Sequence, residues 1–133
     1  AFGATIIVGG QIKGMEPRLF LIYPEGNFIE ASNETPFFQA GETKYGRPII
    51  LRAFDPAMSF EDAIKLLYVS FDSTLKANLA VGMPLDLHAY ETNTFKTGIQ
   101  RRIPSDDAYF RATSSAWGHA LKAAIDELPD FNF

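Results

Sequence analysis

The spacing of apolar residues changes near Tyr45, and this change most restricts what the chain can fold into. Before Tyr45, short β-branched and apolar runs alternate with glycine, proline and asparagine, which is typical of strands joined by turns. Four such runs occur, over residues 5–10, 18–23, 28–31 and 36–40. Gly26 and Asn27 tolerate positive φ and predict a hairpin turn between the second and third runs. We therefore expect an antiparallel meander, covered on both faces, that ends at Gly41.

After Tyr45 the apolar residues recur every three or four positions, which predicts amphipathic helices. The expected elements are a short helix over 49–54, a long helix over 59–77, strands over 85–91 and 96–103, and a final helix over 105–128. Ser59 is a suitable N-cap for the long helix, and Ser105 with the two acids after it should cap the last one. This order predicts an α+β fold, with antiparallel sheet and three helices, as one domain over residues 1–133.

The charge and hydropathy of the chain exclude several classes of partner. Lysine and arginine total 12 and aspartate and glutamate total 16, which gives a net charge of −4. That sign disfavours a broad nucleic-acid or anionic-membrane surface. No apolar run approaches the roughly 20 residues of a membrane-spanning helix, and no basic segment precedes an apolar signal core. We expect a cytoplasmic protein that binds neither nucleic acid nor membrane.

The chain lacks the residues of most metal and nucleophile sites. There is no cysteine, so disulfides, thiolate metal sites and a cysteine nucleophile are excluded. His88 and His119 are the two histidines, and we interpret both as surface residues. Residues 70–74 carry hydroxyls and a carboxylate but scatter them around a helix, and no Gly-x-Ser-x-Gly elbow exists. The sequence therefore predicts no metal and no cofactor.

The segment from Gln39 to Gly46 is the most informative for function, and Gly41 and Gly46 bracket its turn. A predicted strand enters it, polar residues follow, and a helix begins at its end. Glycine at both ends permits close approach of the backbone to another group. From the residues alone, a structural turn and a functional loop both remain open.

Several motifs together resemble the later half of a proteasome-type β subunit, a family of N-terminal-nucleophile hydrolases, and above all its bacterial proteasome-like peptidases. The residues that carry the resemblance are Thr5-Ile-Ile-Val-Gly-Gly, Arg18 to Ala31 with its Pro-x-Gly hairpin, Gln39 to Gly46, Met58-Ser-Phe-Glu-Asp-Ala63, Ser70-Phe-Asp-Ser-Thr74, Asn78-Leu79, Val81-Gly82 and Arg101-Arg-Ile103. They cover nearly all of the chain. The resemblance implies an αββα sandwich, of which this chain would be the later half.

The family cleaves peptides with an N-terminal threonine that serves as nucleophile and, through its own amine, as base. In the family this threonine and its acidic and lysine partners belong to the first strands, and Thr5 does not match it. We therefore expect a C-terminal fragment of a threonine peptidase without catalytic residues of its own. The family's loop after the turn glycine approaches the threonine, which makes Gly41, Glu42 and Lys44 candidates near an active site. Asn78 is a further position whose role the sequence leaves open.

The resemblance also implies partners. Members of the family assemble identical subunits into rings or open spirals, and the complete protein would act on peptides or unfolded proteins inside the cell. An alternative from another class is a stand-alone, non-catalytic α+β assembly or binding domain. The two readings differ in whether a longer form of the protein cleaves peptides.

Overall fold

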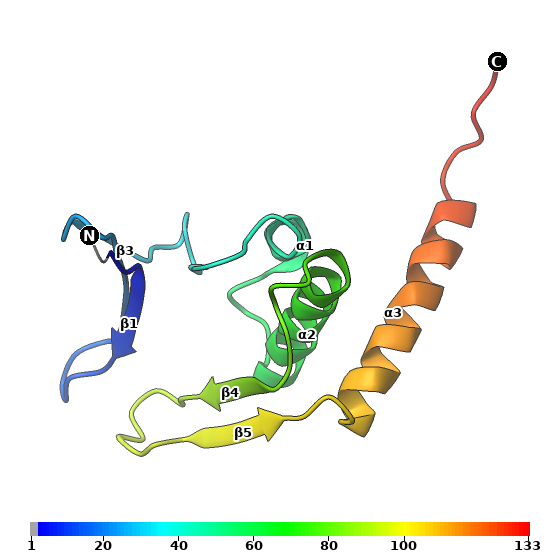
Figure 1. Ribbon diagram of the computed structural model, residues 1–133. Coiled ribbons are helices and arrows are strands. Elements are labelled where there is room, and N and C mark those ends of the chain that lie inside the picture. Colours follow the sequence, from blue (N-terminus) through cyan, green and yellow to red (C-terminus); the bar gives the residue numbers. More distant parts are fainter. Residues whose placement is uncertain (1–2) are drawn as a thin grey trace.

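A computed structural model describes residues 3–133, and apart from one predicted strand its elements have the order that the sequence predicts (Figure 1). The strands and helices are β1 (Ile6–Gly10), β2 (Arg18–Ile22), β3 (Phe28–Glu30), α1 (Arg47–Ala53), α2 (Phe60–Ala77), β4 (Leu85–Ala89), β5 (Ile99–Ile103) and α3 (Ala108–Asp126). The described residues thus form three helices and two small antiparallel sheets. The α+β prediction is confirmed.

The first sheet has the order β1-β2-β3, with Ile6 opposite Ile22 and Phe20 opposite Glu30. Gly26 adopts a φ of +90° in the hairpin between β2 and β3, as its turn position requires. Every residue of β1 and β3 is exposed. The prediction that this meander is covered on both faces is therefore wrong for the described chain, because too few described elements pack against it.

The predicted strand over residues 36–40 does not form. Proline at its first position has no backbone N–H to donate, and in the described part of the chain no neighbouring strand pairs with this segment. It instead crosses from the first sheet to α1. The apolar pattern correctly indicated partial burial, since Phe37 and Phe38 are half-buried. The pattern does not show whether a neighbouring strand is available for pairing.

Local capping positions α2 where the sequence predicted it. The Ser59 hydroxyl accepts a hydrogen bond from the Asp62 N–H at 3.1 Å, so Ser59 is the N-cap. For the last helix, the predicted N-cap was wrong by two residues. Asp107, not Ser105, caps α3 by accepting the Phe110 N–H at 2.8 Å, because residues 104–107 first form a turn.

The core lies where α2, the second sheet and the start of α3 meet. Tyr68, Ile103 and Phe110 form its buried centre, and the apolar side of β4 packs against them. β4 pairs with β5, with Leu85 opposite Ile103. α3 leaves this core after its first turns, and the residues from His119 onward are exposed. Figure 1 shows α3 and the segment after it running away from the rest of the molecule.

Among residues 3–133, none of the helices combines the length and the apolar character that crossing a membrane requires.

Candidate functional site

The loop from Gly41 to Gly46 joins the segment 36–40 to α1 and faces the C-terminal half of α2. Gly41 has a φ of +81°, a left-handed conformation that side chains other than glycine rarely adopt. A Cβ built on Gly41 would meet no atom within 4 Å. Glycine is therefore required at this position by the backbone conformation, whereas contacts within the chain leave room for a side chain.

Glu42 ties this loop to the end of α2. One carboxylate oxygen accepts the Lys44 backbone N–H at 2.9 Å, and the other accepts the Asn78 side-chain amide at 3.0 Å. Asn78 is the C-cap of α2, and its amide oxygen in turn accepts the Ala80 N–H. The structure thus brings together Glu42 and Asn78, which are 36 positions apart. Lys44 contributes its backbone here and its residue is exposed.

Gly46 lets α1 begin in direct contact with α2. A Cβ at this position would lie 2.2 Å from the Ser70 Oγ and 3.2 Å from the Thr74 Oγ1. Gly46 is buried and is the N-cap of α1. The expectation that a glycine of this loop permits close backbone approach is confirmed at Gly46, and the group approached is a helix of the same chain.

Three polar residues of α2 are buried. Ser70, Asp72 and Thr74 are 4%, 6% and 5% exposed. The Thr74 hydroxyl donates to the Ser70 carbonyl at 2.9 Å, and Asp72 pairs with Lys76 at 3.0 Å. The Thr74 hydroxyl and the Asp72 carboxylate therefore both have partners within α2.

A cavity of about 510 Å³ opens beside the loop, between β1, α1 and α2. Its lining is mostly apolar and includes Ile7, Phe37, Phe54, Leu66 and Phe71. Glu42, Ser70 and Thr74 contribute its polar atoms, together with Gln39. An apolar recess with a few polar groups at one end is the usual form of a binding site.

Gln39 also lines this cavity; it begins the segment that the sequence analysis selected but was not among the candidate site residues. Its Oε1 atom is buried and accepts no hydrogen bond within residues 3–133. A buried amide oxygen without a donor costs free energy, so this atom marks a place where a polar group belongs. No pattern in the sequence indicates this, because glutamine in a mixed segment is ordinary.

The side-chain contacts of this arrangement hold the loop in place. Both Glu42 oxygens already accept hydrogen bonds, so this carboxylate holds the loop. His88 lies on the second sheet, where its Nε2 contacts the Thr97 carbonyl, and His119 lies on α3. In the described region no three His, Cys, Asp or Glu side chains gather closely enough to hold a metal ion.

No family model and no curated protein matches the chain, but solved structures do. An Anbu Gly-1 mutant from Hyphomicrobium sp. strain MC1 is 54% identical with a TM-score of 0.96, over 99% of this chain and 56% of that one. Anbu (ancestral beta-subunit) from Yersinia bercovieri is 46% identical with a TM-score of 0.90, over 96% and 54%. The helical assembly of the Anbu complex from Pseudomonas aeruginosa is 44% identical with a TM-score of 0.93, over 98% and 54%.

The shared fold and these relatives define the class as that of proteasome-like β subunits. Within this class the chain is Anbu-like along nearly its whole length and corresponds to part of an Anbu subunit. It spans a little over half the length of the structures it matches. The resemblance inferred from the motifs is thereby confirmed.

Proposed function

We propose that the chain is part of a proteasome-like threonine peptidase that degrades peptides or unfolded proteins in the cytoplasm, and that the catalytic threonine lies outside these 133 residues. The observation that carries this proposal is sequence identity between 44% and 54%, with TM-scores of 0.90 or above, to three Anbu structures. Likeness of this degree over nearly the whole chain supports a shared active-site frame rather than a shared fold alone. The helical assembly described for the Pseudomonas relative supports a homo-oligomer, either a ring or an open spiral.

In this function the loop at Gly41 serves as a support for the nucleophile. Its left-handed turn and the clamp between Glu42 and Asn78 fix the loop in one conformation. A fixed loop can hold the amine of a threonine supplied by the rest of the protein, which is the positioning that such catalysis needs. The apolar cavity beside it, with the unpaired Gln39 oxygen, offers room for groups from outside this chain.

The test compares two proteins. One is expressed from the complete reading frame and the other is the 133-residue chain. We expect the first to cleave fluorogenic peptides and casein, and to lose cleavage when its processed threonine is changed to alanine. We expect the second to show no turnover above buffer, because it lacks a nucleophile and base.

Peptide cleavage by the purified 133-residue chain would contradict the assignment of the nucleophile to another part of the protein. Failure of the protein from the complete frame to cleave any peptide would favour the second candidate, a non-catalytic assembly or binding domain. The observation that keeps this candidate open is the large exposed apolar surface of β1 and α2.

A further inference from the structure

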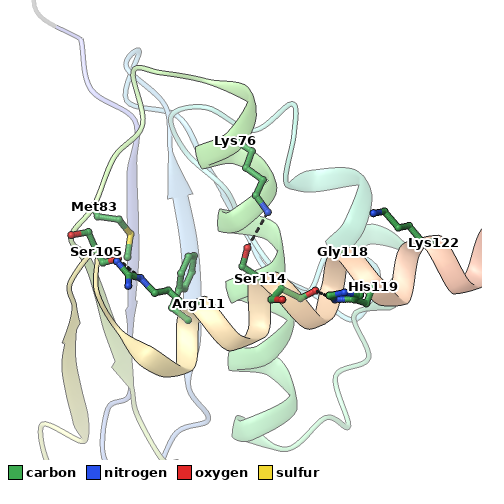
Figure 2. Close-up of a pocket in the computed structure, with 10 residues that line it drawn as sticks. Lys76, Met83, Ser105, Arg111, Ser114, Gly118, His119 and Lys122 are labelled. Atoms are coloured by element: carbon green, nitrogen blue, oxygen red, sulfur yellow. Dashed lines mark hydrogen bonds between the residues drawn. The ribbon is translucent and has the colours of Figure 1, made fainter.

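A groove of about 430 Å³ lies between the end of α2 and α3 (Figure 2). Its floor is apolar and consists of Met83 and Phe110, which belong to or pack against the core. Its rim carries Lys76, Arg111 and Lys122. No acidic side chain lines this groove among the described residues.

Two of these cations have no carboxylate partner in residues 3–133, although the Arg111 Nε donates to the Ser105 carbonyl at 3.3 Å. Lys76 is already paired with Asp72 and also donates to the Ser114 hydroxyl at 2.9 Å. In contrast, no carboxylate of residues 3–133 lies within 4.0 Å of the Arg111 guanidinium or the Lys122 ammonium. Both residues are exposed. In a chain of net charge −4, a groove with this excess of positive charge is a local exception.

The spacing of the two cations favours an extended ligand. Arg111 and Lys122 are eleven positions apart on α3, which corresponds to about 16 Å along the helix axis. One small anion cannot reach both groups at that separation. A polypeptide segment with several acids and some apolar side chains fits the rim and the floor together.

The chain itself carries such a segment directly after α3. Residues 126–133 read Asp-Glu-Leu-Pro-Asp-Phe-Asn-Phe, with acids at Asp126, Glu127 and Asp130. Phe131 is 78% exposed, and all residues from 126 to 133 are exposed. Figure 1 shows this segment continuing away from the rest of the molecule. It is therefore presented to a neighbour.

We propose that residues 126–133 of one copy dock in the α2–α3 groove of a second copy. Glu127 and Asp130 pair with Arg111 and Lys122, and the aromatic residues cover the floor formed by Met83 and Phe110. This inference deepens the homo-oligomer part of the proposed function. Because the segment and the groove are different surfaces, the contact is head-to-tail, and repetition of it produces a ring or an open helix.

The test uses the protein from its complete reading frame and three charge-reversal variants. The groove variant is Arg111→Glu with Lys122→Glu, and the tail variant is Glu127→Lys with Asp130→Lys. The matched control is Lys13→Glu with Arg52→Glu, which changes net charge as the groove variant does at exposed sites outside the groove. Sedimentation velocity measures assembly, and melting midpoints confirm that each variant folds.

We expect the wild type and the control to assemble, and the groove and tail variants to lose the assembled species. Equimolar groove and tail variants should assemble when mixed, because the native tail fits the native groove and the reversed tail fits the reversed groove. A chain carrying all four reversals should assemble again. Wild-type assembly should weaken as salt screens the charge pairs.

Wild-type-like assembly of the groove or tail variant overturns the proposal, as does a monomeric wild type. Peptide cleavage, measured on the same preparations, is a separate readout. If peptides are cleaved but the contact is absent, only the docking proposal fails. If the protein assembles through the contact but cleaves no peptide, only the peptidase proposal fails.

Discussion

At the scale of single residues, the two glycines at the ends of the candidate loop have different structural roles. Gly41 is needed for its φ of +81°, whereas Gly46 is needed because the Ser70 hydroxyl occupies the place of a Cβ. The sequence treated them as equivalent ends of one turn. Substitution separates the two roles.

Gly46→Ala should lower the free energy of unfolding by about 1–3 kcal/mol, as overpacking does. Adding Ser70→Ala removes the hydroxyl that the new Cβ of Gly46→Ala would meet, and should restore part of that loss. Gly118→Ala is the control, since this helical glycine has open space around it and should gain about 1 kcal/mol from helix propensity. Urea unfolding compares the wild type, Gly46→Ala, Ser70→Ala, the double variant and Gly118→Ala. Additive effects of Gly46→Ala and Ser70→Ala would contradict the contact.

Gly41→Ala should cost about 1 kcal/mol through backbone strain. Gly26→Ala is its match, because Gly26 also has positive φ and no atom within 4 Å of a Cβ. In the protein from the complete reading frame we expect similar melting midpoints for the two variants, but a loss of peptide cleavage only for Gly41→Ala. Equal cleavage by both variants would show that the Gly41 turn is structural only.

At the scale of elements, the second sheet is held partly by a surface ion pair. Arg102 on β5 donates to both oxygens of Asp86 on β4, at 2.8 and 3.0 Å. These hydrogen bonds, more than the charge itself, hold the pKa of Asp86 below its ordinary value of 3.8. A lowered pKa means that the folded state favours the ionised form.

The pair therefore stabilises the fold above the ordinary pKa of Asp86, and this stabilisation is lost as the pH falls through the lowered value. We expect melting midpoints between pH 6 and pH 3, about the range that brackets the titration, to fall less steeply in Asp86→Asn than in the wild type. Asp106→Asn is the control, because Asp106 makes no ion pair in the described chain. An unchanged slope in Asp86→Asn would show that the pair contributes nothing measurable, as many exposed pairs do.

At the scale of the whole molecule, the chain leaves much of its surface uncovered. It exposes 10256 Å², whereas a compact monomer of 14.8 kDa exposes about 7,000 Å². Ile6 and Val8 of β1 are 49% and 45% exposed, and Phe71 of α2 is 42% exposed. Apolar area of this extent requires a covering partner.

The purified 133-residue chain should therefore associate at tens of micromolar, roughly the range in which weak contacts populate. Light scattering should give a mass above 14.8 kDa, and raised salt should not dissolve the associated species, because burial of apolar area drives it. Ile6→Asn should reduce the association. A stable wild-type monomer would contradict the claim that the exposed apolar surface requires a covering partner.

The sequence by itself determined the elements whose signals lie within a few residues. The hairpin around Gly26, the N-cap at Ser59 and the period of α2 are local, because each depends on backbone conformations and hydrogen bonds between near neighbours. The motifs also identified the class, since their order along the chain is itself sequence information.

Tertiary structure alone decided which distant groups meet. The Glu42–Asn78 clamp, the contact of Gly46 with Ser70 and the buried Gln39 oxygen join or isolate residues from separate segments. Segment 36–40 has a strand-like sequence but remains unpaired, and β1 is exposed although its residues are apolar. Whether a segment pairs or is buried depends on the surfaces of the elements around it. The pattern of residues within one segment contains no information about those surfaces.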